Sequence, residues 1–168
     1  GYLLVTPLQL AVMTARLVNG GFAVTPKLTN AISRHAGAAQ AGPAFPSMEI
    51  SARHLELVRN AMRDVSNSPY GTAHRSRIDK PEWAMGGKTG TVQVRRITKA
   101  ERDTRVLKNN ELPWEQRDHA LFVGFAPVDN PRYAVSVVVE HGGGGSTTAA
   151  PIARDILVEA QRRNSAGS

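Results

Sequence analysis

Apolar residues recur at helical spacing in two stretches of the first half of the chain. Thr6-Pro7-Leu8-Gln9 is typical of a capping box with proline at the first helical position, and it precedes a stripe formed by Leu10, Met13, Leu17 and Val18. This helix is expected to end at Asn19-Gly20-Gly21. Ser51 can cap a second helix that ends near residues 66–69, with a stripe formed by Leu55, Val58, Met62 and Val65. Residues 36–47, rich in Ala, Gly and Pro, are predicted to form the loop between them.

The second half of the chain reads as strands followed by a helix. Residues 83–94 are predicted to form a strand because they end in the alternating run Thr91-Val92-Gln93-Val94. Residues 119–126 and 133–139 are two further apolar runs, and the turn residues 127–131 between them favour an antiparallel hairpin. The glycines of residues 142–145 precede a last helix that carries Pro151 in its first turn and an apolar face of Ile152, Ile156, Leu157 and Ala160. The predicted fold class is mixed α/β (α+β), with three antiparallel strands, the last helix on one sheet face and the first two helices in a helical lobe.

Residues 95–118, between the first predicted strand and the hairpin, are polar and densely charged. The segment is longer than the usual structureless connection. It is interpreted either as a border of an active site or partner surface, or as a solvated mobile loop, since mixed charges are typical of solvent-facing segments.

Composition limits the classes of partner. The 168 residues suffice for one domain, and the net charge of +7 favours an anionic partner such as nucleic acid, an acidic membrane surface or a carboxylate-bearing substrate. Only 5% of residues are aromatic and the basic residues are scattered, which argues against nucleic acid. The chain has no cysteine, and its five histidines show no metal-ligand spacing, so neither a metal nor a cofactor is expected. No apolar run is long enough to span a membrane, and a start at Gly1 without methionine suggests the inside of a longer protein.

The run Gly86-Gly87-Lys88-Thr89-Gly90-Thr91 carries the candidate chemistry. A phosphate-binding loop would need glycine where Glu82 stands, and a helix in place of the predicted strand, so that interpretation is rejected. In a carboxylate-binding interpretation the glycines let a substrate backbone approach, Lys88 supplies positive potential and the Thr89 hydroxyl donates to a carboxylate. The backbone N–H of Thr91 would serve as one oxyanion-hole donor. The alternative is a glycine-punctuated bulge beside a solvent-facing lysine.

Five blocks occur in an order typical of one family: YLLVTPLQLA (2–11), YGTAH (70–74), GKTGTVQV (87–94), HALFVGFAP (119–127) and VVEHGG (138–143). Nearly the whole chain resembles the C-terminal half of the transpeptidase domain of class B penicillin-binding proteins, most of all the penicillin-binding protein 2 group of rod-shape elongation. The resemblance implies a penicillin-binding-protein/β-lactamase-like fold, with residues 1–80 as part of a helical lobe and residues 81–168 as sheet strands and C-terminal helix.

The same resemblance implies a serine-type D-Ala-D-Ala transpeptidase of peptidoglycan synthesis that β-lactam antibiotics trap as an acyl-enzyme. Lys88 would match the lysine of the third family motif, and Thr89, Gly90 and Thr91 would help to bind the substrate or β-lactam carboxylate. The Thr91 N–H would match an oxyanion donor whose partner is the N–H of the nucleophilic serine. The family further implies the periplasmic face of the bacterial inner membrane and a glycosyltransferase partner of the elongation machinery.

The chain departs from the family in lacking a nucleophile motif. No serine is followed by lysine three residues later, Ser76 and Lys80 being one residue too far apart, and no Ser-x-Asn or Tyr-x-Asn occurs. The expectation is that the N-terminal remainder of the same domain supplies the serine and that this chain alone is inactive. A non-catalytic sensor or scaffold that lacks the serine is the alternative.

Three other features have weaker interpretations. His119 opens a predicted strand near the motif and is a candidate for contact with the cleft. Glu140-His141 and the following glycines favour a flexible connection over an anion-binding nest. Gly71-Thr72 favours a structural turn over a substrate contact.

Overall fold

The computed structural model describes residues 4–27 and 45–166. It contains the three predicted strands and the three predicted helices. The main elements in chain order are α1 (Pro7–Val18), α2 (Ala52–Asn67), β1 (Gly86–Val92), α3 (Lys99–Thr104), β2 (His119–Ala126), β3 (Tyr133–Val139) and α4 (Ala150–Ala166). Residues 36–44 of the predicted loop lie outside the described residues. The fold is therefore a mixture of helices and an antiparallel sheet, as the sequence predicts.

The capping box predicted for α1 is confirmed. The N–H of Gln9 donates to the Thr6 hydroxyl (3.2 Å), and the N–H of Thr6 donates to Gln9 Oε1 (2.8 Å). In α2, Leu55 and Met62 are buried and Val65 is half-buried, but Val58 is exposed, so the predicted stripe is only partly correct. Ser51 occupies the N-cap position of α2 without a side-chain cap hydrogen bond.

The three strands pair in the order β1-β2-β3, and both pairs are antiparallel. The predicted hairpin joins β2 to β3, and the Ala126–Pro127 peptide bond at its turn is cis. β1 is shorter than predicted. Trp83 lies in a short 3₁₀ turn, and beyond Val92 the N–H of Val94 donates to Asp118 Oδ1 (3.4 Å) instead of to a neighbouring strand.

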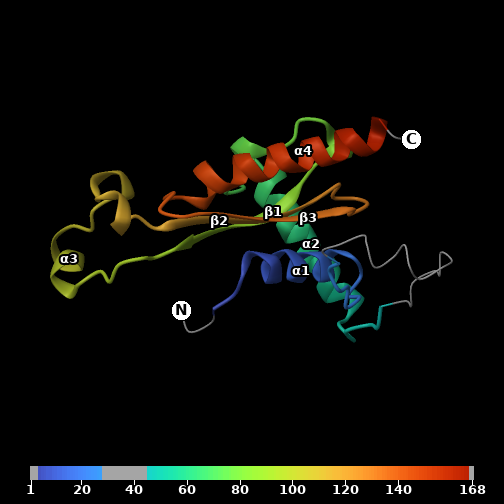
Figure 1. Cartoon of the computed structure of the whole chain (residues 1–168), viewed down its shortest axis with the longest axis horizontal. Coiled ribbons are helices and arrows are strands. Elements are labelled where there is room, and N and C mark those ends of the chain that lie inside the picture. The colour runs from blue at the N-terminus through green and yellow to red at the C-terminus, as the bar shows by residue number, and fades with distance from the viewer. Residues whose placement is uncertain (1–3, 28–44, 167–168) are drawn as a thin grey trace.

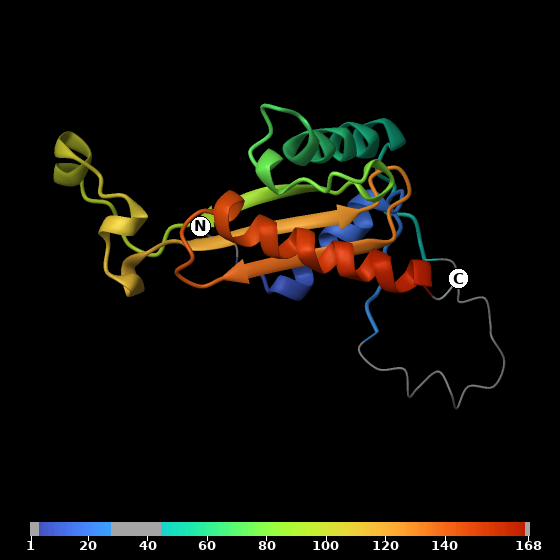
Figure 2. The same ribbon diagram turned by 90° about the horizontal axis from the view of Figure 1, so that it is seen from above.

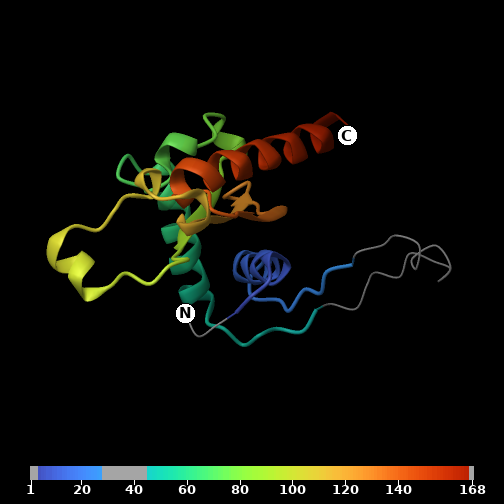
Figure 3. The ribbon, with the colours of Figure 1, turned by 60° about the vertical axis from the view of Figure 1, so that its left-hand side comes forward.

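Helices cover both faces of the sheet. Figure 1 shows the sheet almost edge-on, with α4 above it and α1 below. Figure 3 shows α1 nearly end-on beneath the strands. α1 contacts β2 and β3, and α2 contacts β1. Both helices therefore pack against the sheet, while the assignment of residues 1–80 to a helical lobe and the division of the domain at residue 80 stay predictions.

The apolar core divides between the two faces because strand side chains alternate. On the α4 face, Phe122 is buried with Met85 and Leu157. On the α1 face, Phe125 is buried with Val18 and Met62. β2 is the central strand and supplies both phenylalanines. It also pairs with β1 along the whole length of the motif strand, from Gly86 to Val92.

The sheet-facing side of α4 agrees with the predicted face at Leu157 but differs from it at Ile152 and Ile156. Ile152 and Ile156 are 42% and 47% exposed, whereas Ala150, Ala153 and Leu157 are buried. These alanines recur at helical spacing, and their small side chains let the helix lie close to Ala120 and Phe122 of the sheet. Pro151 lies in the first turn of α4, as predicted.

Residues 95–118 form an extension beyond β1 and β2, which we name the arm. Figure 2 shows it projecting from one end of the sheet. It contains α3 and two short 3₁₀ turns, Asn109–Glu111 and Trp114–Gln116. The arm therefore has short helical elements of its own, and both interpretations, an active-site border or partner surface and a solvated mobile loop, stay predictions.

Candidate active-site wall on strand β1

The motif lies on a strand that forms an edge of the described sheet, because β1 pairs only with β2. Lys88 is directly opposite Val123 and Thr89 is directly opposite Phe122. Residues that face each other in an antiparallel pair project to the same side of the sheet. Lys88 therefore projects to the α1 face, and Thr89 projects to the α4 face. The side chains of Lys88 and Thr89, the two groups that the sequence singled out, therefore lie on opposite faces of the strand.

Gly86 and Gly87 serve packing rather than substrate approach, which corrects the prediction for these two residues. A Cβ at Gly86 would lie 2.8 Å from the Phe125 ring, and a Cβ at Gly87 would overlap the Phe122 ring and the Val123 carbonyl oxygen. Such separations are too short for real contacts. The two glycines leave room for the Phe122 and Phe125 rings to pack against the main chain of the motif strand. This packing fixes the position of the strand.

Lys88 is exposed, and its Nζ donates a hydrogen bond to the Thr89 carbonyl oxygen at 2.7 Å. Among the described residues it forms no ion pair with a carboxylate. Its positive charge is thus held close to the strand backbone without being neutralised, and it can attract an anionic group laid along β1.

The Thr89 hydroxyl lies 3.2 Å from the Thr72 hydroxyl, either of which can donate. Thr72 is exposed and precedes the buried Ala73 in the connection between α2 and β1. Sequence reasoning assigned Thr72 to a structural turn and missed this contact. The only signal was that Thr72 lies in one of the five family blocks, because its partner is 17 residues away in the chain.

Gly90 and Thr91 complete the candidate wall. Gly90 is half-buried and Thr91 is exposed. A Cβ on Gly145, in the π-helical turn Gly145–Ala149 before α4, would overlap the Gly90 main chain. The turn therefore packs against the main chain of Gly90, whereas the neighbouring Thr91 is exposed. The oxyanion role of the Thr91 N–H stays a prediction.

His119 and His141 have structural partners at the far end of β1. His119 Nδ1 accepts from the N–H of His141 at 2.9 Å, and the His141 Nδ1 contacts the Arg117 carbonyl oxygen at 3.0 Å. Because a carbonyl oxygen only accepts, His141 Nδ1 carries the proton. The N–H of Gly143 donates to the Asp118 carbonyl oxygen at 2.8 Å. The predicted flexible connection after β3 is thus tied to the start of β2, and a contact of His119 with the cleft stays a prediction.

Two carboxylates of the arm have lowered pKa values. Glu101 accepts from the N–H of Thr98 (2.9 Å) and from Arg95 (2.6 Å), and these bonds, that from the Thr98 backbone above all, lower its pKa. Glu111 accepts from the N–H of Lys108 (2.8 Å) and pairs with Arg105, and the backbone bond is the larger cause of its lowered pKa. Charged hydrogen bonds thus link separate parts of the arm to one another.

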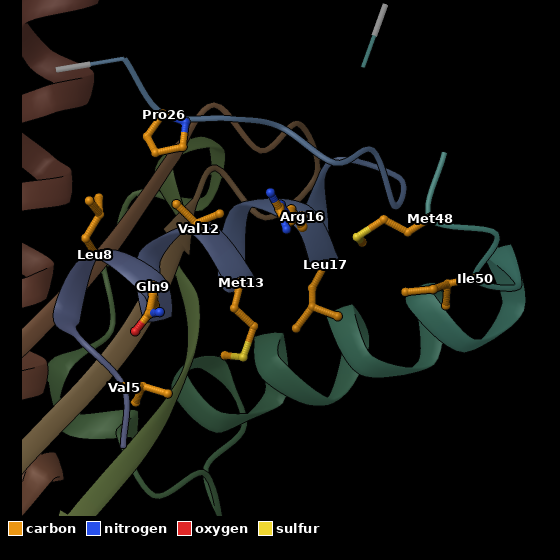
Figure 4. A pocket seen from close by; sticks show the side chains of 10 residues that line it. All are labelled: Val5, Leu8, Gln9, Val12, Met13, Arg16, Leu17, Pro26, Met48 and Ile50. Carbon is orange, nitrogen blue, oxygen red and sulfur yellow. The ribbon is translucent and has the colours of Figure 1, made fainter. Parts of the chain in front are cut away.

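An apolar groove lies along α1. Its volume is about 640 Å³, and Figure 4 shows Leu8, Val12 and Met13 of α1 lining it together with Met48 and Ile50. Leu8 is 47% exposed and Met13 is 46% exposed. This much exposed apolar surface is typical of a face that another polypeptide covers.

In residues 4–27 and 45–166 we find no cluster of three or more His, Asp or Glu side chains that could hold a metal ion. Within the same ranges no helix combines the length and apolar character needed to cross a bilayer.

Comparison with known families identifies the relatives of this fold. Residues 1–158 match the penicillin binding protein transpeptidase domain family. The chain belongs to this family. Peptidoglycan D,D-transpeptidase MrdA of Haemophilus influenzae is 36% identical over 160 residues, which are 94% of this chain and 24% of the relative. MrdA of Escherichia coli K12 is 31% identical over 147 residues, covering 86% of this chain and 22% of the relative.

Solved structures agree with this membership. The complex between penicillin-binding protein 2 and MreC from Helicobacter pylori matches with a TM-score of 0.72 and 25% identity, over 96% of this chain and 26% of that one. Penicillin-binding protein 2 of Pseudomonas aeruginosa in complex with WCK 5153 matches with a TM-score of 0.65 and 30% identity, over 96% and 31%. The transpeptidase-type fold predicted from the motif blocks is confirmed. The chain spans about a quarter of the length of these curated relatives.

Proposed function

We propose that this chain forms the substrate-binding wall of a peptidoglycan D,D-transpeptidase. The observation that carries the proposal is the exposed edge strand β1, on which Lys88 has no carboxylate partner among the described residues and Thr89 presents a hydroxyl. Curated relatives named peptidoglycan D,D-transpeptidase support it. The substrate class would be the D-Ala-D-Ala end of a peptidoglycan stem peptide, and β-lactams would compete for the same wall.

In the proposed reaction a serine outside this chain attacks the carbonyl carbon between the two D-alanines and displaces the terminal D-alanine. The resulting acyl-enzyme is resolved by an amine of a neighbouring stem. Lys88 supplies the positive field, and the Thr89 and Thr91 hydroxyls bind the terminal carboxylate, with Gly90 leaving room between them. The N–H of Thr91 stabilises the oxyanion, a type of interaction worth about 3 to 4 kcal/mol of transition-state stabilisation.

The serine would come from the N-terminal remainder of the same domain, because this chain contains no Ser-x-x-Lys motif. We propose that this remainder also covers the groove along α1. The family further suggests that the complete protein acts at the periplasmic face of the inner membrane, with a glycosyltransferase of the elongation machinery as its partner. The Helicobacter pylori relative was solved in a complex with MreC, so a protein of that kind is a further proposed partner.

A chimaeric transpeptidase tests the proposed wall. Residues 1–158 replace the matching segment of the Haemophilus influenzae relative, whose own remainder supplies the other motifs. Covalent labelling by a fluorescent penicillin is expected, and Lys88→Ala should slow it about a hundredfold, the typical loss when a charge-stabilising group is removed. Lys27→Ala, which removes an exposed lysine far from the motif in sequence, is the matched control and should label normally. Labelling of the Lys88→Ala chimaera at an undiminished rate would contradict the assigned role.

The missing serine also favours a second candidate, a sensor or scaffold that keeps the fold without catalysis. The coding sequence upstream of Gly1 in the source genome separates the two. A Ser-x-x-Lys motif encoded in the same reading frame supports the enzyme, and a transpeptidase-like segment without that serine supports the scaffold.

A further inference from the structure

We infer that Thr72 is a positioning residue for carboxylate recognition. Its hydroxyl donates to the Thr89 hydroxyl, so that the single proton of Thr89 stays available to the substrate carboxylate. The inference rests on the proposed function and adds to it a residue outside the Lys-Thr-Gly run. In the predicted Gly71-Thr72 turn, Gly71 then has a structural role and Thr72 has a functional one.

The contact itself defines the chemistry. The two hydroxyl oxygens are 3.2 Å apart, Thr72 coming from the connection after α2 and Thr89 from the middle of β1. A hydroxyl has one proton to donate and can accept two hydrogen bonds. If Thr89 donated to Thr72, it would have no proton left for a carboxylate. If Thr72 donates, Thr89 can accept from it and donate onward at the same time.

A bound carboxylate selects the second arrangement. Hydrogen bonds to an ionised acceptor are about twice as strong as those between neutral groups, so the Thr89 proton turns toward the carboxylate. Thr72 then donates to a lone pair of the Thr89 oxygen, and the chain O–H···O–H···O⁻ is mutually polarised. Thr72 thereby strengthens the hydrogen bond from the Thr89 hydroxyl to the carboxylate, although Thr72 itself does not contact the carboxylate.

Thr72 is held rigidly for this role. A Cβ at Gly71 would overlap the carbonyl oxygens of Asp64 and Val65, so glycine is required where the chain presses against the end of α2. The N–H of Ala73 donates to the Val65 carbonyl oxygen at 2.9 Å, and the N–H of His74 donates to the Gly71 carbonyl oxygen at 3.1 Å. Ala73 is 1% exposed and belongs to the main core. Both neighbours of Thr72 are therefore fixed, while its own side chain is exposed beside the motif.

Thr89 is equally fixed on its side of the contact. It lies opposite the fully buried Phe122 of β2, and Lys88 donates to its carbonyl oxygen. The Asn67 amide of α2 donates to the Met85 carbonyl oxygen at 2.8 Å, which ties the start of the motif strand to the helix from which Thr72 follows. Two rigid elements thus set the distance between the hydroxyls before any ligand arrives.

The test compares a penicillin that has a free carboxylate with its methyl ester, in the chimaeric transpeptidase. Acylation kinetics give the dissociation constant of the reversible complex and the rate constant of acylation separately. Thr72→Val keeps the side-chain shape and removes the hydroxyl. We expect it to raise the dissociation constant of the free acid about fivefold, the loss typical of one hydrogen bond. The dissociation constant of the ester and both acylation rate constants should stay unchanged, and Thr72→Ser should restore the affinity for the free acid.

Equal losses for the acid and the ester would show a merely structural role and overturn the inference, as would no loss at all or a failure of Thr72→Ser to rescue. Thr89→Val separates this failure from that of the proposed function. If Thr89→Val weakens only the free acid while Thr72→Val does not, the inference alone is wrong. If Thr89→Val weakens acid and ester equally, Thr89 does not bind the carboxylate, and both the assigned role of Thr89 and the inference are wrong.

Discussion

His119 Nδ1 accepts a hydrogen bond from the main-chain N–H of His141 at 2.9 Å, and the two rings meet edge to face with their centroids 4.7 Å apart. His119 is the first residue of β2, paired with Val92 at the end of the motif strand, whereas His141 follows β3. His141 has a φ of 53°, in the left-handed region that a non-glycine residue seldom adopts. The bond from its N–H helps to hold that conformation and closes the sheet at the end where Thr91 lies.

His119→Phe should destabilise the domain, because it keeps a ring but removes the acceptor and leaves the His141 N–H unpaired. The expected loss is about 1 to 2 kcal/mol in the free energy of unfolding, measured by urea denaturation of the chimaera. His54→Phe, at an exposed position of α2, is the control and should stay within about 0.5 kcal/mol. Equal stability of the two variants would show that the contact does not contribute.

The arm should loosen in acid. The pKa values of Glu101 and Glu111 are lowered in the folded protein from an ordinary value of 4.5. A lowered pKa means that the charged form stabilises the fold above the unfolded value, and that this contribution is lost as pH falls through the folded value. Protonation, which begins only as the pH falls to these lowered values, therefore weakens the bonds to Thr98, Arg95, Lys108 and Arg105.

Hydrogen exchange of residues 95–118 at pH 6 and at pH 3, corrected for the intrinsic rate at each pH, measures this loosening. Exchange should rise in the arm more than in β2. Glu101→Gln should raise it already at pH 6, whereas Glu115→Gln, which changes an exposed carboxylate of the arm, should not. An arm that exchanges equally at both pH values would contradict the role of the charged bonds.

Met13→Asp tests whether the α1 groove is covered in the complete domain. If another segment buries Met13, the aspartate loses its water and the chimaera should lose about 2 to 4 kcal/mol of stability. Val106→Asp in the arm is the control, because Val106 is 42% exposed and Met13 is 46% exposed in this chain. Thermal unfolding of both variants gives the comparison, and a neutral Met13→Asp would show that the groove is open to solvent.

Local sequence signals predicted the secondary structure well where one pattern dominated. The bounds of β2 and β3 agree with the two apolar runs, because each run ends in turn residues. The sheet-facing side of α4 was predicted correctly at Leu157 and wrongly at Ile152 and Ile156, since these larger residues made the stronger apolar stripe in sequence. Alanine contributes little to such a pattern, yet close packing of a helix on a sheet favours it.

The candidate site was predictable to the extent that it is local. Lys88 and Thr89 lie on a strand as the motif indicated, because six consecutive residues carry that information. The partner of Thr89 was missed, since the contact with Thr72 depends on how α2 docks on β1. The roles of Gly86 and Gly87 were also wrong, because the phenylalanines that require them come from β2, more than 30 residues later in the chain.

The most direct measurement of the central claim is a crystal structure of the chimaeric transpeptidase acylated by a penicillin. The account predicts that the penicillin carboxylate lies within hydrogen-bond distance, about 2.6 to 3.0 Å, of the Thr89 and Thr91 hydroxyls. It also predicts that the acyl oxygen points to the Thr91 N–H and that Lys88 Nζ lies beside the adduct. A carboxylate bound elsewhere, with Thr89 and Thr91 facing only solvent, would contradict the claim that β1 is the substrate-binding wall.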